Sequence, residues 1–531
     1  MKKGYFTLLL HAHMPFVHHP EFEDFLEEDW FYEAITETYI PLYLMMKRLE
    51  KEEIPFRITM SITPPLANMM TDAMLRQRYS RHLANLEKLI KKEAVRMKKN
   101  PALGKVVEMY REHFISCRHV INEFSGGIIE GFKYFQNKGN LEIVTCTGTH
   151  GFLPLMENVQ DARAQVRMAV ADYAEKFGRK PRGIWLAECA YTEGVADILK
   201  ENGIRYFFVD THGILYGCPR PKYAVYAPVF CPSGVAVFAR DVESSMQVWS
   251  SEIGYPGDYR YREFYRDVGY DLSYKYIKPH LHKDGVRRNT GVKYYKITGK
   301  VPLNQKQFYN PDEAREAAES HAKHFVFCRK LQCEYLESVL GVTPIIVAPY
   351  DAELYGHWWF EGPDFLYYLF KEFALWGEIE PITPSEYLAG HPVLQKLKPS
   401  PSTWGDKGYN EVWLNGTNDW IYRHLHHAAR NMIRLSRREA SGIEERVLNQ
   451  MARELMLAES SDWAFIMTTG TMVPYACKRT KQHLKNFLDL MNMLERKNID
   501  INFLKTCEER NNIFPGMDYR IYRSVAPPAD A

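Results

Sequence analysis

Two acidic residues stand where short apolar runs of this sequence end. Glu188 closes the run RGIWLAEC, and Asp351 closes TPIIVAPYD. Chemistry at a glycosidic bond requires two carboxyl groups, because one must protonate the leaving oxygen while the other attacks or supports the anomeric carbon. Their surroundings must hold the two pKa values apart, so that one group is protonated and the other ionised near neutral pH. Acidic residues at such positions can also be helix N-caps, but several acidic residues that converge at one end of a fold favour a catalytic role.

Three histidines accompany the acids and leave a second chemistry open. His11 and His13 end the first apolar run, and His150 follows the run LEIVTC. Side chains two residues apart lie on the same side of a strand, so these imidazoles together with Asp351 could bind zinc for hydrolysis or deacetylation. A zinc enzyme would lose activity with a chelator, whereas a carboxyl pair needs no metal. We favour the carboxyl pair and expect no metal and no cofactor.

Tryptophans beside Gly, Pro, Asp or Ser in turns offer flat rings on which the apolar faces of sugars stack. Half-buried core tryptophans are the alternative interpretation. Trp185, Cys189 and the pair Trp358–Trp359 are expected to supply apolar walls near the acids. The tryptophans in turns are Trp249, Trp358, Trp359, Trp404, Trp413 and Trp463.

The elements that must position these residues are short runs rich in β-branched and aromatic residues, separated by helical sequence. Such alternation is typical of an α/β fold, a parallel sheet with crossover helices, here closed into a barrel. Catalytic side chains of these barrels lie at the C-terminal ends of strands, so the acids and histidines should meet at one mouth. The runs are 5–13, 55–62, 141–146, 182–189, 205–210, 235–241 and 343–354.

Other segments depart from this alternation. Charged helical sequence over residues 66–135 predicts a helical insertion, and residues 242–310, dense in Tyr, Gly, Pro and Arg, predict long functional loops. The Pro-rich segment 391–404 marks a boundary. We therefore expect a catalytic barrel over 1–400 and an all-α domain over 401–531. Within the barrel, one helix carries an apolar stripe at steps of four and three that would pack on the sheet. Its members are Ile35, Tyr39, Leu42, Met46 and Leu49.

The composition narrows the classes of partner. The formal charge of +2 results from 68 basic and 66 acidic residues, and the sequence has no long run of charges of one sign. This balance argues against nucleic acid or an anionic membrane as the main partner. The sequence contains no uninterrupted stretch of about 18 apolar residues, so we expect no membrane-spanning helix. Near the N-terminus, His11 and His13 interrupt the short apolar run and no small-residue cleavage site follows, so we expect a cytoplasmic protein. The nine cysteines are scattered and form no CxxC pair, which disfavours a disulfide framework and a zinc knuckle. P-loop, GxGxxG and GxSxG signatures are absent from the sequence.

Five stretches, in order, resemble the conserved regions of glycoside hydrolase family 57. Within that family, WLAECAY, the long YGHWWFEGP extension and ESSDW are similar to the 1,4-α-glucan branching enzymes and not to the shorter amylase and glucanotransferase versions. The five stretches are HAHMPF (11–16), GTHGFLP (148–154), WLAECAY (185–191), PYDAELYGHWWFEGP (349–363) and LAESSDWAFIM (457–467).

The resemblance implies an incomplete seven-stranded (β/α) barrel with a helical insertion, followed by a helical C-terminal domain. It implies a retaining mechanism in which Glu188 is the nucleophile and Asp351 the proton donor, with Glu353 in support. Donor and acceptor α-1,4-glucan chains would be the substrates, and an α-1,6 branch the product; an α-amylase or 4-α-glucanotransferase is the alternative. The motif YREFYRD offers Arg262 and Arg266 as a substrate contact, and we favour the latter. The implied substrate contacts are His11, His13, His150, Arg266, Gly285, Trp404 and Asp462.

Overall fold

The seven apolar runs all form strands in the computed structural model, which describes residues 2–250 and 253–524. The strands are almost entirely buried, because helices cover one side and the barrel interior the other, and this explains their nearly continuous apolar sequence. They are β1 (Gly4–Ala12), β2 (Ile58–Ile62), β3 (Leu141–Val144), β4 (Gly183–Ile184), β5 (Tyr206–Val209), β7 (Ala236–Ala239) and β8 (Ile345–Asp351).

These strands form two parallel sheets that meet edge to edge. One has the order β3-β2-β1-β8 and the other contains β4-β5-β7. Thr145 pairs with Ile184 and so joins β3 to β4, while the Asp241 N–H donates to the Val347 carbonyl at 2.9 Å between β7 and β8. The predicted incomplete seven-stranded barrel is confirmed. Two further short strands, β6 (Val229–Phe230) and β9 (Ile379–Pro381), lie against β7 and β1 and were not predicted.

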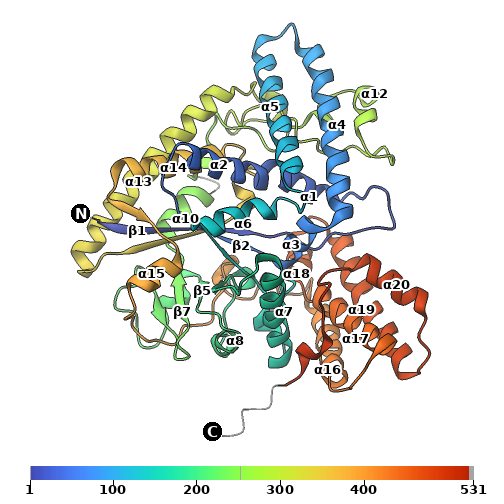
Figure 1. Cartoon of the computed structure of the whole chain (residues 1–531). Coiled ribbons are helices and arrows are strands. Elements are labelled where there is room, and N and C mark those ends of the chain that lie inside the picture. The colour runs from blue at the N-terminus through green and yellow to red at the C-terminus, as the bar shows by residue number, and fades with distance from the viewer. Residues whose placement is uncertain (1, 251–252, 525–531) are drawn as a thin grey trace.

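The helical insertion between β2 and β3 is also confirmed. Its two long helices run antiparallel and project from the top of the barrel in Figure 1. Asp72 and Asn100 cap their N-termini by accepting backbone N–H groups of the first turn. The helices are α3 (Pro64–Thr71), α4 (Ala73–Met97), α5 (Pro101–Glu123) and α6 (Ile129–Lys138).

Crossover helices connect the remaining strands. After β1 the chain forms α1 (Glu28–Ala34), a π-helical turn η1 (Ile35–Tyr39) and α2 (Ile40–Lys51). The segment 242–310 is mostly irregular as predicted, but it begins with α10 (Val242–Trp249), which the sequence did not indicate. The other helices are α7 (Val159–Phe177), α8 (Val195–Glu201), α9 (Thr211–Leu215), α11 (Val268–Asp271), α12 (Tyr274–Ile277), α13 (Pro311–Leu340), α14 (Gly362–Trp376) and α15 (Pro384–Gly390).

The C-terminal part of the chain is helical and packs beside the barrel (Figure 1). The segment before it still belongs to the barrel, because Lys396, Lys398 and Ser402 pair with barrel residues; a boundary at 400/401 stays a prediction. None of the helices in the described ranges is long and apolar enough to cross a membrane. The helices are α16 (Tyr422–Leu435), α17 (Gly442–Ala458), α18 (Ser461–Thr469), α19 (Val473–Glu495) and α20 (Ile501–Arg510).

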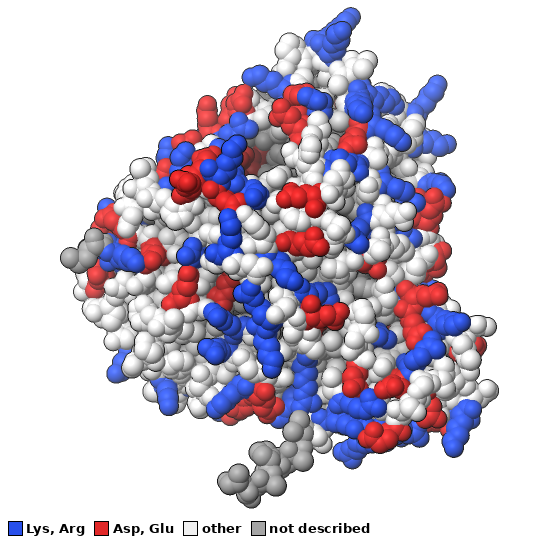
Figure 2. Space-filling model, viewed as in Figure 1, with Lys and Arg blue, Asp and Glu red and all other residues white. Residues whose placement is uncertain are grey.

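Charged side chains of both signs alternate over the face of the molecule in Figure 2. This distribution agrees with the nearly balanced count of 68 basic and 66 acidic residues. A mixed surface of this kind does not create the single-sign field that attracts a polyanion.

Candidate active site

The two acids predicted from the sequence lie at the C-terminal ends of their strands. Asp351 is the last residue of β8 and stands opposite His11 in the parallel pairing with β1. Glu188 follows β4 in a short turn and adopts a left-handed backbone conformation with φ of 60° and ψ of 26°. A residue other than glycine adopts this backbone conformation only where the surrounding structure enforces it, and such residues are frequent at functional sites.

Two donors from the C-terminal half of the chain hold the Glu188 carboxylate. The Trp404 Nε1–H donates to Oε2 at 2.9 Å, and the Ser461 hydroxyl donates to Oε1 at 3.1 Å. The Trp404 backbone N–H also donates to the Glu188 carbonyl at 3.1 Å. Burial raises the pKa of Glu188 above its usual value and the negative charge of Asp462 adds to this, whereas the bond from Trp404, the charge of His13 and the bond from Ser461 each oppose the rise. These donors favour the ionised form that a nucleophile needs.

Asp351 is buried as well, but the charged groups that act on it are negative. Burial raises its pKa well above the usual value, and the negative charges of Glu353 and Glu188 raise it further. A group in such surroundings keeps its proton near neutral pH. The site therefore pairs a carboxyl group that retains its proton with one that hydrogen bonds help to ionise, as acid and nucleophile require.

A chain of hydrogen bonds leads through two histidines to Glu188. Burial lowers the pKa values of His11 and His150 far below the usual range, so both imidazoles are neutral. The contacts are Ser61 Oγ to His11 Nδ1 at 3.3 Å, His11 Nε2 to His150 Nε2 at 3.1 Å, and His150 Nδ1 to Ser461 Oγ at 2.7 Å. An ionised Glu188 can only accept hydrogen bonds, so each group in this chain must donate its hydrogen to the next group on the side of Glu188. One set of tautomers satisfies this order.

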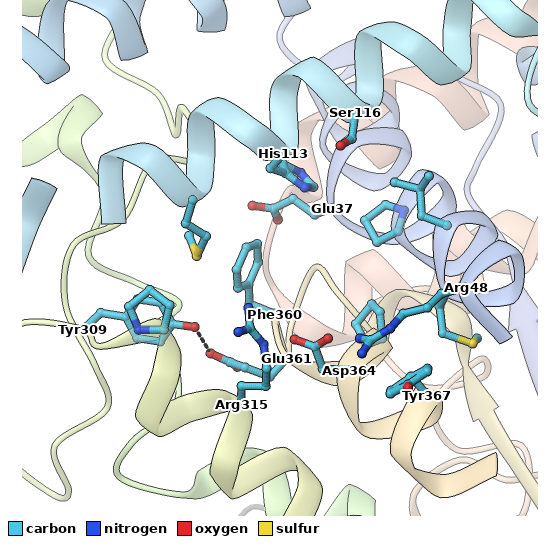
Figure 3. A pocket seen from close by; sticks show the side chains of 16 residues that line it. Glu37, Arg48, His113, Ser116, Tyr309, Arg315, Phe360, Glu361, Asp364 and Tyr367 are labelled. Atoms are coloured by element: carbon cyan, nitrogen blue, oxygen red, sulfur yellow. Dashed lines mark hydrogen bonds between the residues drawn. The ribbon is translucent and has the colours of Figure 1, made fainter. Parts of the chain in front are cut away.

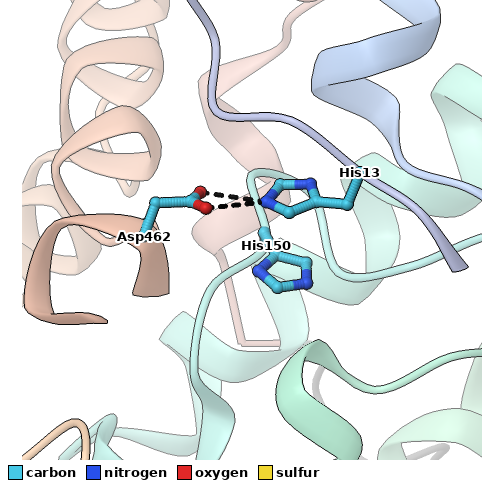
Figure 4. A group of neighbouring side chains, drawn as sticks. All are labelled: His13, His150 and Asp462. Carbon is cyan, nitrogen blue, oxygen red and sulfur yellow. Dashed lines mark hydrogen bonds and ion pairs between the residues drawn. The ribbon is translucent and has the colours of Figure 1, made fainter. Parts of the chain in front are cut away.

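His13 and Asp462 form an ion pair beside His150 (Figure 4). The His13 Nε2 lies 2.9 and 3.0 Å from the two Asp462 carboxylate oxygens, and its ring stacks on His150 with centroids 3.6 Å apart. Burial alone would raise the pKa of Asp462, but the charge of His13 holds it at about 2. Ligand atoms of these three residues lie within 4.8 Å of one another, as a metal site would require. Their nitrogens already have protein partners: Thr63 hydrogen-bonds His13 Nδ1 at 3.1 Å.

Aromatic rings wall the site, although not all of those expected. Trp185 is fully buried, and its ring stacks on His11 with centroids 5.2 Å apart. The Trp404 ring packs edge-on against Trp185 with centroids 4.7 Å apart. Trp359 is only 1% exposed, so it belongs to the core and not to a sugar-facing wall. Its neighbour Trp358 is 53% exposed and stacks on Phe264 at 4.5 Å.

The structure brings together Glu188, Asp351, His11, His13, His150, Trp404 and Asp462. The two loop residues expected to contact substrate lie elsewhere in the segment 242–310. Arg266 binds Asp271 and the Leu303 carbonyl and stacks on Tyr295 at 3.3 Å. Gly285, at a φ of +70°, accepts a hydrogen bond from Tyr274 through its carbonyl. A substrate contact for either stays a prediction.

Sequence reasoning missed several residues that hold the catalytic groups. Ser461 lies inside the quoted stretch LAESSDWAFIM, so its position next to Asp462 was the available signal. Ser61 lies near the end of β2 and Thr63 directly follows the strand, where polar side chains were again a signal. The Tyr39 hydroxyl, which donates to Glu353 two positions after Asp351, had no such signal, because the spacing of Tyr39 matched an apolar stripe.

A separate cavity of about 270 Å³ is lined by Glu37 of η1 and by residues of α2, α5, α13 and α14 (Figure 3). None of the catalytic residues named above lines it. One of its acids, Glu361, accepts from the Tyr309 hydroxyl at 2.7 Å and from a backbone N–H at 3.0 Å through the same oxygen. Arg48 stacks on Tyr367 at 3.5 Å. The cavity is therefore distinct from the carboxyl pair.

Comparisons with known proteins agree on the kind of protein this chain resembles. Residues 7–338 match the model of glycosyl hydrolase family 57, and residues 424–522 match the model described as 1,4-alpha-glucan branching enzyme, C-terminal. A 1,4-alpha-glucan branching enzyme of Thermococcus kodakarensis is 35% identical over 99% of this chain and 79% of the relative.

Two solved structures are similar over their whole length. The novel α-amylase AmyC from Thermotoga maritima is 47% identical with a TM-score of 0.93, covering 99% of this chain and 100% of the other. A branching enzyme of the same family from Pyrococcus horikoshii is 33% identical with a TM-score of 0.88, covering 99% and 98%. The similar structures therefore include both a hydrolase and a transferase.

Proposed function

The chain belongs to glycosyl hydrolase family 57, and from that premise we propose that it is a 1,4-α-glucan branching enzyme. The branching-enzyme relatives and the match of residues 424–522 to a branching-enzyme C-terminal model support this assignment. The observation that carries the chemistry is the carboxyl pair, in which Trp404 and Ser461 stabilise an ionised Glu188 while burial and neighbouring charge keep Asp351 protonated.

The proposed reaction is a double displacement. Asp351 donates its proton to the α-1,4 glycosidic oxygen as the Glu188 carboxylate attacks the anomeric carbon, so the C–O bond of the donor breaks and a glucanyl ester forms. The ionised Asp351 then takes the proton of an acceptor 6-hydroxyl, and that oxygen displaces Glu188. The product is an α-1,6 branch, both carboxyl groups return to their starting state, and the anomeric configuration is retained.

The surrounding residues have proposed roles in holding the glucan. His13 and Asp462 present a charged, hydrogen-bonded pair to the sugar nearest the cleavage point, and His11 and His150 orient the groups that bind Glu188. Arg266 and Gly285 are proposed to contact a glucan chain from the long loops. The nine cysteines are all free, which fits a reducing compartment, and we place the enzyme in the cytoplasm.

An α-amylase is the second candidate, because the structure that is 47% identical is described as one. The two activities share the first step and differ in what attacks the glucanyl ester. Transfer exceeds hydrolysis only where an acceptor chain is held in line and water is excluded.

The distinguishing experiment uses amylose as substrate. Reducing ends are counted after incubation, before and after digestion with a debranching enzyme specific for α-1,6 links. A branching enzyme gives an increase only after debranching. A large increase before debranching, with little afterwards, would mean that water is the acceptor and the chain is an amylase.

A further inference from the structure

A π-helical turn interrupts the helix that follows β1. The turn, η1, lies between α1 and α2, and all five of its residues are buried. Short π-helical turns insert an extra residue into a helix and are frequent at functional sites. Because η1 includes Thr, Glu, Thr and Tyr, its buried polar groups need partners inside the protein.

Three consecutive residues of η1 bind the segment that leaves the catalytic strand β8. The Tyr39 hydroxyl donates to Glu353 Oε1. The backbone N–H of His357 donates to Thr38 Oγ1 at 3.1 Å, and its Nδ1 lies 2.8 Å from Glu37 Oε2. The π turn therefore fixes both ends of a five-residue segment that begins two positions after the proposed proton donor.

The contact between the two segments is also direct between their backbones. Gly356 has a φ of +130°, and a Cβ added there would lie 1.9 Å from the Glu37 carbonyl oxygen. The second carboxylate oxygen of Glu37 accepts from Arg262 at 3.1 Å, and both side chains are almost fully buried. Arg262 and His357 hold the pKa of Glu37 far below its usual range, against the effect of burial. The π turn is thus itself anchored and cannot shift without breaking a buried ion pair.

We propose that Tyr39 is a positioning residue for Asp351 and acts through Glu353. This inference rests on the proposed function of Asp351 as proton donor. The Glu353 Oε1 accepts both the Tyr39 hydroxyl and the His13 backbone N–H at 3.3 Å, so the carboxylate is fixed between the π turn and the end of β1. Burial raises the pKa of Glu353 to about 7, and the bond from Tyr39 opposes this rise and so favours the ionised form. The negative charge of Glu353 in turn favours the protonated form of Asp351, and the same bonds set the path of the backbone that follows it.

Tyr39→Phe tests this role, because it removes one hydroxyl and leaves the ring in its buried site. The readout is kcat/KM, relative to the wild type, for two donors that differ in their need for a proton. Cleavage of malto-oligosaccharide needs protonation of the leaving oxygen. α-Maltosyl fluoride loses fluoride with little protonation while Glu188 attacks, and its kcat/KM reports on the steps up to fluoride departure. We expect at least about a tenfold loss with malto-oligosaccharide and less than about a twofold change in fluoride release.

Tyr32→Phe is the matched control. Tyr32 lies in α1, the helix directly before η1, and is 4% exposed. Its hydroxyl donates to the buried Glu28 at 2.9 Å. The two variants lose the same group from similarly buried sites, so their thermal unfolding should change alike. The control should keep both donor activities, because Tyr32 and Glu28 do not contact the carboxyl pair.

The outcomes separate the inference from the proposed function. Equal losses with both donors, or no loss with malto-oligosaccharide, would mean that Tyr39 serves only to fill space and would overturn the inference. A wild-type protein inactive on both donors would instead refute the proposed function. Glu353→Gln provides an independent check, because it removes the charge and should reproduce the selective loss even where Tyr39→Phe lowers stability.

Discussion

Replacing Ser461 with alanine should change the pH dependence of the enzyme. The serine hydroxyl donates to Glu188 Oε1 at 3.1 Å and is the last link of the chain from His150. A hydrogen bond to a charged group contributes about 1.5 to 3 kcal/mol, and one pKa unit corresponds to about 1.36 kcal/mol, so its loss should raise the pKa of Glu188 by about 1 to 2 units. Because the nucleophile must be ionised, the acid limb of kcat/KM moves to higher pH by that amount.

The assay is the initial rate of α-1,4 cleavage across the pH range, with kcat/KM extracted at each pH. Ser436→Ala is the control, since Ser436 is fully buried in the same helical region and donates to the Ile433 carbonyl at 2.9 Å, away from the site. Its profile should match that of the wild type. An acid limb that stays in place, or moves to lower pH, in Ser461→Ala would refute the assignment of Glu188 as a nucleophile ionised with help from this donor.

Three further outcomes are expected. Glu188→Gln and Asp351→Asn should each lower glucan turnover by at least about 10³-fold, and Asp351→Asn should retain more activity on α-maltosyl fluoride, because fluoride leaves without a proton. EDTA should leave the rate unchanged; a loss restored by zinc would show instead that His13, His150 and Asp462 hold an ion. The pKa of Asp462 is lowered from 3.8 to about 2, so its contribution of about 2 kcal/mol is present above the unfolded pKa and is lost as pH falls through about 2. Asp462→Asn should therefore lower the free energy of unfolding near neutral pH and flatten its decline in acid, as measured by guanidinium unfolding.

The strands of the barrel could be predicted because their burial on both faces leaves a continuous apolar signal. All seven runs form strands, and Glu188 and Asp351 lie at their C-terminal ends as the barrel rule requires. The short β6 and β9 could not be found, because two or three residues carry no period. The helix α10 was hidden for a similar reason: its eight residues lie at the start of a segment whose composition is typical of loops.

The roles of individual side chains were harder to predict than the strands. The stripe from Ile35 to Leu49 correctly indicated a helix facing the core, and Tyr39 is indeed fully buried. Periodicity treats tyrosine as one more apolar residue, so it cannot reveal that the hydroxyl binds Glu353. The same limit applied to Trp359, where a turn-like neighbourhood suggested a sugar platform and the structure shows a core residue.

The nucleophile depends on contacts from a part of the chain that is distant in sequence. Ser461 begins α18, and its backbone N–H donates to the His150 carbonyl at 3.0 Å, while Trp404 reaches Glu188 from the connecting segment. Ser402 pairs with Tyr191 and so keeps Trp404 with the barrel, but a displacement of the helical region would remove the Ser461 donor from Glu188 and open the site to water in the same motion. Loss of this donor slows formation of the glucanyl ester, and entry of water favours its hydrolysis. The packing of the helical region against the barrel should thus govern both the rate and the choice between transfer and hydrolysis.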